Sequence, residues 1–190
     1  MNVPNTLTLA RVLLIPVFIV FLSKGDLFGL PLDTRSFIAL VIFSIASITD
    51  WLDGYIARKT GQITKLGKLF DPIADKLLTS AALILLVDHN RASAWIVILI
   101  IGRDFAVTGL RAAAAGEGHI IPAAEGGKAK LVFQTIAIIA LLMDMSMKFE
   151  YLDTYLIGTV SMWVSMILAV VSGFMYFKNN WRKIGLIGGE

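Results

Sequence analysis

The sequence predicts an all-α integral membrane protein with six transmembrane helices in a single domain that covers residues 1–190. Its composition points to the membrane, because 57% of the 190 residues are hydrophobic and only 16% are charged. The mean hydropathy of +0.78 is far above that of a water-soluble domain of this length. Six apolar runs, extended into their flanks, also approach the ~20 residues that a helical span requires.

The six runs are separated by segments rich in turn-forming residues. The first run follows five neutral residues and lacks a convincing small-residue cleavage site, so we expect it to remain as a helix and not to be a removable signal peptide. Turns are expected at residues 25–31, 88–90, 116–127 and 148–154. The runs themselves lie at about residues 6–23, 36–49, 77–87, 92–101, 131–143 and 155–177.

The basic residues predict the orientation of the helices. With a cytoplasmic N-terminus, thirteen Lys and Arg residues fall on or near the cytoplasmic side and only four, Lys24, Arg35, Arg91 and Lys148, on the other side. This is a clear positive-inside bias. It places residues 50–76 at the cytoplasmic face, so a site there would take its water-borne solutes from the cytoplasm.

Four aspartates in this segment predict a metal site. At 1.5 Å per residue, Asp50 lies roughly 22 Å from the outer end of a helix that begins near Arg35, so it is inside the membrane or at its inner edge. Asp50 and Asp53 share one helix face, as do Asp71 and Asp75 on the next helix. Four ionised carboxylates in a low-dielectric cleft need compensating cations.

The chemistry of this cluster favours hard cations. Its ligands are all oxygen, and the chain has no cysteine, which suits Mg²⁺ or Mn²⁺ and excludes a zinc–thiolate site. Two such ions ~4 Å apart would serve a displacement at phosphorus. Gly54 would let a phosphate or nucleotide approach the helix, small Ala57 keeps the face open, and Arg58 would pair with phosphate. A single intramembrane aspartate could be structural, but four in register favour function.

These residues resemble the signature of the CDP-alcohol phosphotransferase family. The resemblance covers nearly the whole chain, since a signature that bridges the second and third of six helices is also the family arrangement. Eight residues match in identity and spacing across 26 positions, which is a specific signal: Asp50, Asp53, Gly54, Ala57, Arg58, Gly67, Asp71 and Asp75.

The resemblance implies a reaction and roles for these residues. An alcohol hydroxyl would attack the β-phosphorus of a CDP-linked lipid, and CMP would leave. The four aspartates would hold two divalent cations, Mg²⁺ or Mn²⁺, and Asp75 would also be the general base. The CDP group would contact the two metal-binding aspartates Asp50 and Asp53 and the residues Gly54, Ala57, Arg58, Thr64 and Gly67.

A second group of charges predicts a pocket for an anionic acceptor. Arg103 lies about ten residues into its helix, near the middle of the membrane, where an arginine needs a partner such as Asp104. Arg111 adds a second cation two turns further on. Lys128, Lys130 and Gln134 start the following helix, and the cluster suits a phosphate ester. The alternative for the two lysines is an ordinary contact with lipid headgroups.

Three shorter stretches resemble bacterial family members whose acceptor is glycerol 3-phosphate. They are "NVPNTLTLARVLLIP", "RDFAVTGLR" and "GKAKLVFQT". The chain departs from these relatives at Asp104, where Glu is more common, and at Leu131 and Val132. By the same resemblance Asn5 and Thr8 lie near the nucleotide, and their alternative role is to cap the first helix.

We therefore expect an enzyme of the bacterial cytoplasmic membrane whose active site faces the cytoplasm. Its expected partners are CDP-diacylglycerol, glycerol 3-phosphate, membrane lipids and a second copy in a homodimer, and no nucleic acid. The product would be phosphatidylglycerophosphate. Within the same enzyme class, the alternative acceptors are inositol phosphate, serine or another phosphatidyl lipid. An alternative from another class is a divalent-cation transporter. Transporters often have inverted repeats and broken helices, and the sequence shows neither.

Overall fold

The computed structural model of the chain describes residues 3–25, 29–60, 65–116, 125–147 and 151–180. Side chains are described at residues 10–25, 29–50, 74, 76–116, 127–147 and 151–180. The described part is helical and contains no strand, as the composition and the apolar runs predicted. Its six helices are α1 (Val3–Leu22), α2 (Leu32–Thr60), α3 (Lys65–Asp88), α4 (Ala94–Gly116), α5 (Glu125–Ser146) and α6 (Thr154–Asn180).

Three of these helices contain a span that is long and apolar enough to cross a membrane. Within the described residues these spans are Leu32–Asp50, Gly127–Ser146 and Thr154–Asn180, and Ala10–Leu22 is a shorter apolar helix. The helices α3 and α4 have 24 and 23 residues, which is also enough to cross a bilayer. They carry the predicted site charges, including Asp71, Asp75, Arg103 and Arg111, and these charges lower their apolar character. The protein is an integral membrane protein.

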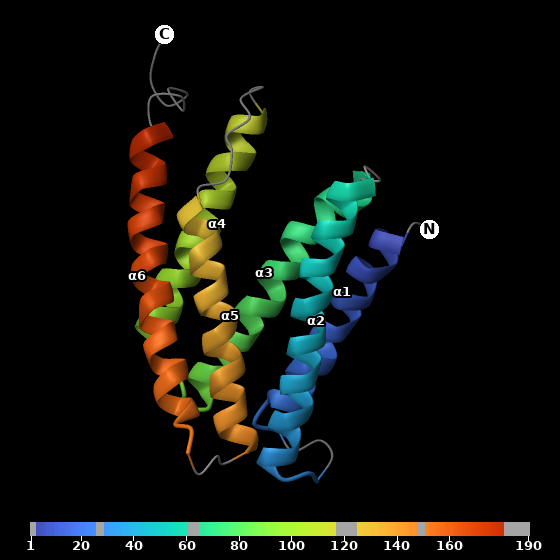
Figure 1. The fold of residues 1–190 in the computed structure, drawn as a ribbon, viewed down its shortest axis with the longest axis vertical. Helices are drawn as coiled ribbons and strands as arrows, with labels where there is room; N and C mark the ends of the chain where they lie inside the picture. Colours follow the sequence, from blue (N-terminus) through green and yellow to red (C-terminus); the bar gives the residue numbers. More distant parts are fainter. Residues whose placement is uncertain (1–2, 26–28, 61–64, 117–124, 148–150, 181–190) are drawn as a thin grey trace.

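The helices pack as a bundle in which α5 contacts both α6 and α2, α4 contacts α6, and α1 contacts α2 and α3 (Figure 1). Phe18 of α1 and Phe43 of α2 are fully buried, with ring centroids 6.1 Å apart. Gly158 lets α6 approach α5 closely, because a Cβ there would lie 2.6 Å from Leu141 Cγ. In a bilayer the hydrophobic effect contributes little to helix association, so helices associate through close packing, which small residues such as glycine allow.

Polar contacts tie the helices together at the end of the bundle where α1 and α3 end and α2 and α4 begin. Arg35 of α2 donates to the carbonyl of Ser23 at 2.8 Å. His89, just after α3, makes a 2.6 Å hydrogen bond with the carbonyl of Leu22. Arg91 and Asp144 form a 2.7 Å ion pair between the start of α4 and the end of α5. This end is therefore held together by structural contacts.

The other end of the bundle carries the predicted site. The start of α1, the end of α2, the start of α3, the end of α4, the start of α5 and the end of α6 all lie there (Figure 1). The first three helices diverge from α4, α5 and α6 toward this end, as Figure 1 shows. The aspartate signature and the basic cluster thus belong to the same end of the molecule.

Candidate active site

The aspartate signature lies where α2 ends and α3 begins. Asp50, Asp53, Gly54, Ala57 and Arg58 belong to α2, and Gly67, Asp71 and Asp75 belong to α3. Both segments are helical, so the spacings of three and four residues place each aspartate pair on one helix face. The side chains of residues 51–73 and of residue 75 lie outside the described part, so the convergence of the four carboxylates stays a prediction.

The other residues predicted to lie near the nucleotide are described only in part. Thr64 falls outside the described residues. Asn5 and Thr8 belong to α1, but their side chains are not among those described. Because α1 begins at Val3, both residues lie within the helix and do not precede it. The capping alternative is therefore wrong for both, since a capping residue flanks the helix.

Asp50 is the one signature aspartate whose side chain is described, and it pairs with an arginine of another helix. Its Oδ1 lies 2.6 Å from Nη1 of Arg11 in α1. The Arg11 side chain is 2% exposed, whereas that of Asp50 is 44% exposed. The protein therefore supplies one of the compensating charges that the predicted acidic cluster would require. Arg11 is one of the thirteen basic residues that the sequence analysis used only to predict orientation, although a charged residue inside an apolar helix is itself a signal of function.

The part of the site that is described is compatible with a divalent cation. Asp50 faces accessible space and not the core, and a carboxylate has two oxygens with about four acceptor sites, so it can contact Arg11 and an ion together. Among the described side chains no three potential metal ligands cluster. The predicted ligand set is oxygen only, which fits Mg²⁺ or Mn²⁺.

A basic pocket of about 180 Å³ lies between α3, α4, α5 and α6. This is smaller than the ~300–1,000 Å³ of pockets for drug-sized ligands and suits a small polar molecule. Four of the five predicted acceptor-binding residues line it, namely Arg103, Arg111, Lys128 and Lys130. The structure thus brings together cations that are separated by up to 27 positions in the sequence.

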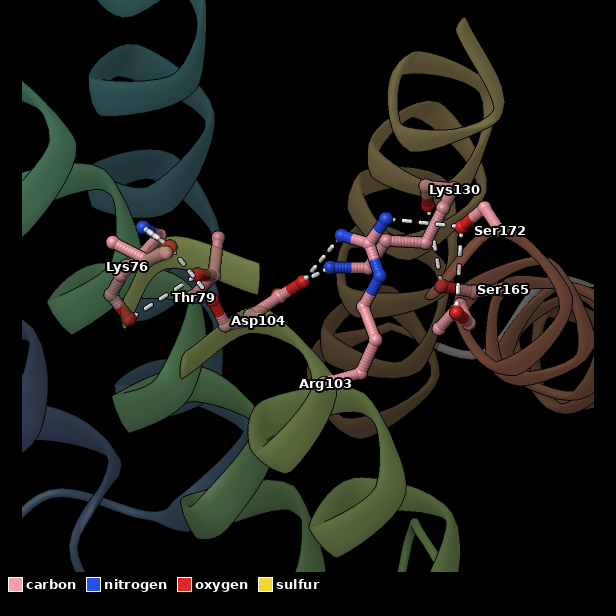
Figure 2. Close-up of polar contacts among 9 residues, drawn as sticks. Lys76, Thr79, Arg103, Asp104, Lys130, Ser165 and Ser172 are labelled. Atoms are coloured by element: carbon pink, nitrogen blue, oxygen red, sulfur yellow. Dashed lines mark hydrogen bonds and ion pairs between the residues drawn. The ribbon is translucent and has the colours of Figure 1, made fainter. Parts of the chain in front are cut away.

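Asp104 connects two of these cations. Its Oδ1 accepts a 3.2 Å hydrogen bond from Nη1 of Arg103, and its Oδ2 accepts one from Nζ of Lys130, across from α4 to α5 (Figure 2). The Lys130 side chain is only 1% exposed, so its charge is compensated within the protein. This confirms Asp104 as the expected partner of Arg103. Burial in an ion pair also argues against Lys130 being an ordinary contact with lipid headgroups.

The helix α6 holds Arg103 from the other side. Nη2 of Arg103 donates to Oγ of Ser172 at 3.0 Å (Figure 2). Gly173 leaves room for the arginine, since a Cβ there would lie 2.9 Å from Arg103 Cγ. Ser165, two turns earlier, donates to the carbonyl of Lys130 at 3.2 Å. Sequence reasoning assigned no site residue to α6, because its serines and glycines are also typical of plain helix packing.

Gln134 has a different place from the one predicted. It is 1% exposed and lies one turn beyond Lys130 in α5, but it does not line the pocket. Its Oε1 is buried and has no hydrogen-bond partner among the described residues. Gln134 is therefore a buried residue outside the pocket lining, on the same face of α5 as Lys130.

The pocket also contains Lys76, which the sequence analysis did not assign to it. Lys76, labelled in Figure 2, directly follows Asp75 in α3, and its Nζ donates to Oγ1 of Thr108 in α4. Thr108 in turn donates to the carbonyl of Asp104 at 2.7 Å. The pocket therefore adjoins α3 next to Asp75, the predicted general base. The Cα atoms of Asp75 and Lys76 are ~3.8 Å apart, because the two residues are consecutive in the chain.

Together these observations define an integral membrane protein with a small basic pocket that is lined in part by α3, one of the two helices that carry the acidic signature. The family model described as CDP-alcohol phosphatidyltransferase matches residues 1–171. The chain belongs to the CDP-alcohol phosphatidyltransferase family, which generally uses divalent cations. The family predicted from the signature is thereby confirmed.

Curated relatives match along nearly their whole length. A CDP-diacylglycerol–glycerol-3-phosphate 3-phosphatidyltransferase of Bacillus subtilis is 46% identical over 189 residues, which cover 96% of this chain and 97% of the relative. Proteins with the same name are 37% identical in Rickettsia typhi, with 93% and 96% covered, and 35% identical in Pseudomonas fluorescens, with 96% and 95% covered.

Proposed function

We propose that the protein transfers the phosphatidyl group of CDP-diacylglycerol to glycerol 3-phosphate and so forms phosphatidylglycerophosphate and CMP. The observation that carries this proposal is the basic pocket, which suits a phosphorylated acceptor and directly adjoins the signature helix α3 through Lys76. The names of the similar proteins support glycerol 3-phosphate as the acceptor. A basic pocket by itself suits inositol phosphate as well, but it disfavours serine.

The roles of the signature residues follow from the family resemblance. Asp50, Asp53, Asp71 and Asp75 would hold two divalent cations, which would supply charge stabilisation for the pyrophosphate. The Asp50 side chain is half-exposed and pairs with Arg11. This exposure and pairing support a position at the edge of the acidic cluster. The CDP group would contact Asn5, Thr8, Asp50, Asp53, Gly54, Ala57, Arg58, Thr64 and Gly67.

The acceptor is bound in the basic pocket. Arg103, Arg111, Lys128 and Lys130 face the phosphate of glycerol 3-phosphate, with Lys76 as a further cation. Asp104 holds the Arg103 and Lys130 side chains in place, and we assign Gln134 a supporting position beneath Lys130. Charge-assisted hydrogen bonds from guanidinium and ammonium groups are the strong contacts of such a site.

The chemical step begins when the Asp75 carboxylate takes the proton of an acceptor hydroxyl. The hydroxyl oxygen forms a bond to the β-phosphorus of CDP-diacylglycerol, and the bond from that phosphorus to the bridging oxygen of CMP breaks. The CMP phosphate keeps the electron pair, and Asp75 passes its proton to solvent. The phosphorylated end of the acceptor stays in the basic pocket, which orients its hydroxyl for attack.

The site is proposed to open to the cytoplasm of a bacterial cell. The basic pocket includes Arg111 from the last turns of α4, Lys128 from the start of α5 and Tyr176 from the last turns of α6. By contrast, Lys24 follows the end of α1, Arg35 lies in the first turn of α2 and Arg91 precedes α4, which places these three basic residues at the other end of the bundle. This distribution supports a cytoplasmic position for the pocket. The family resemblance also implies a homodimer, which cross-linking in native membranes would test.

The proposed function is tested by offering different acceptors to the purified protein. Labelled CDP-diacylglycerol, Mg²⁺ or Mn²⁺, and one of glycerol 3-phosphate, inositol phosphate or serine are combined in detergent micelles. We expect CMP and a labelled phospholipid with glycerol 3-phosphate. Product only with inositol phosphate would overturn the acceptor but keep the reaction. No CMP with any acceptor, together with metal uptake into liposomes, would favour a transporter.

A further inference from the structure

The hydroxyl of Tyr176 is a buried donor that the proposed reaction does not yet use. Tyr176 belongs to α6 and is 4% exposed. Its hydroxyl is buried and has no hydrogen-bond partner within the described part of the chain, and the residue lines the basic pocket. Buried hydroxyl groups are normally paired, so an exception at the wall of a pocket calls for an explanation.

The ring of Tyr176 is held in place by apolar neighbours. It packs in a small buried cluster with Val107 and Ala114 of α4, against which Leu110 and Phe177 also pack. The backbone carbonyl of Tyr176 accepts a 2.8 Å hydrogen bond from Nδ2 of Asn180. A ring anchored in this way has little rotational freedom to lose, so the position of its hydroxyl is fixed before a ligand arrives.

The chemistry of the surrounding residues excludes most of them as acceptors for the Tyr176 hydroxyl. Arg103 and Arg111 line the same pocket as Tyr176. Guanidinium and ammonium groups donate hydrogen bonds but cannot accept them. Asp104 is the acidic side chain among the described pocket residues; its oxygens accept from Arg103 and Lys130, and the Tyr176 hydroxyl makes no hydrogen bond to it. A ligand with oxygen acceptors would satisfy the tyrosine and the cations together.

We propose that Tyr176 is an acceptor-binding residue whose hydroxyl donates a hydrogen bond to the phosphate of the incoming substrate, beside Arg103 and Arg111. This inference rests on the proposed function, because it assigns the phosphorylated acceptor to the basic pocket. The pocket then binds its ligand through one neutral hydrogen-bond donor in addition to its cations. Binding of a phosphate monoester removes the cost of leaving this hydroxyl buried without a partner.

The substitution Tyr176→Phe tests the inference, because it removes one oxygen atom and keeps the ring. We expect the KM for glycerol 3-phosphate to rise about tenfold, as is usual when a hydrogen bond to a charged group is lost. We expect kcat and the KM for CDP-diacylglycerol to change less than twofold. The thermal midpoint in detergent should stay the same or rise, since a buried unpaired hydroxyl is removed.

Tyr155→Phe is the matched control, because Tyr155 lies in the same helix at the opposite end. Its ring faces the Arg91 guanidinium at 5.8 Å, and this contact does not need the hydroxyl. We expect this variant to behave as the unchanged protein. An equal rise in KM in both variants would show a general effect of the substitution and would overturn the inference.

Binding of inorganic phosphate, measured by calorimetry without CDP-diacylglycerol, separates this inference from the proposed function. The measurement is made on monodisperse protein well below its thermal midpoint, so that reduced stability does not imitate reduced affinity. Weaker phosphate binding by Tyr176→Phe supports the inference even if glycerol 3-phosphate proves to be the wrong acceptor. Unchanged phosphate affinity overturns it, even if the protein makes phosphatidylglycerophosphate.

Discussion

The substitution Gly173→Ala offers a direct test of how α6 positions the acceptor-binding arginine. A Cβ at this position would lie 2.9 Å from Cγ of Arg103, and 3.5 Å from its Nε. Carbon atoms are in optimal contact at about 3.5–4.0 Å, so the Arg103 stem or the helix has to move by about 0.6 Å or more. Cγ is close to the backbone, so the displacement carries the whole guanidinium with it.

The structure gives the size of the expected effect. Arg103 donates to Ser172 at 3.0 Å and to Asp104 at 3.2 Å, and a shift of this size would lengthen or misalign at least one of these bonds. Overpacking of this kind typically costs ~1–3 kcal/mol. If about 1.4 kcal/mol of this falls on acceptor binding, kcat/KM for glycerol 3-phosphate decreases about tenfold.

The assay is CMP release at saturating CDP-diacylglycerol with varied glycerol 3-phosphate. Gly109→Ala in α4 is the matched control, because a Cβ at Gly109 meets nothing within 4 Å among the described residues. Alanine is also the better helix former by ~1 kcal/mol, so the control should be neutral or slightly stabilising. If Gly173→Ala has the same kcat/KM as Gly109→Ala, then α6 does not position Arg103 for binding.

Three further predictions concern the charges of the site. Asp104→Asn should destabilise the protein by ~3 kcal/mol in denaturant titrations, because it removes the carboxylate that pairs with buried Lys130. The control Asp104→Glu keeps a carboxylate and should retain most of the stability. An Asn variant as stable as the unchanged protein would contradict the ion pair. EDTA should abolish CMP release and Mg²⁺ or Mn²⁺ should restore it, so turnover by metal-free protein would refute the metal site. Asp75→Asn should lower kcat by ~10²–10⁴ while CDP binding partly survives, and unchanged turnover would remove Asp75 as the base.

The sequence determined the class of the protein and the positions of its helices along the chain. Hydropathy depends on composition along the chain alone, so six helices and a membrane location could be predicted and are confirmed. The spacing of Asp50 to Asp75 was enough for the family, which is confirmed as well. Even the pairing of Arg103 with Asp104 could be expected, because neighbours in a chain are within reach of each other.

Only the tertiary structure decided which distant residues meet. Lys130 contacts Asp104 across 26 positions, and Arg103 contacts Ser172 across 69. Arg11 likewise pairs with Asp50 of another helix. Such contacts depend on the distance and rotation of packed helices, which the periodicity of one helix does not contain. Periodicity tells which residues share a face, and the packing of that face against its neighbours decides whether a lysine, a glycine or a tyrosine becomes part of the site.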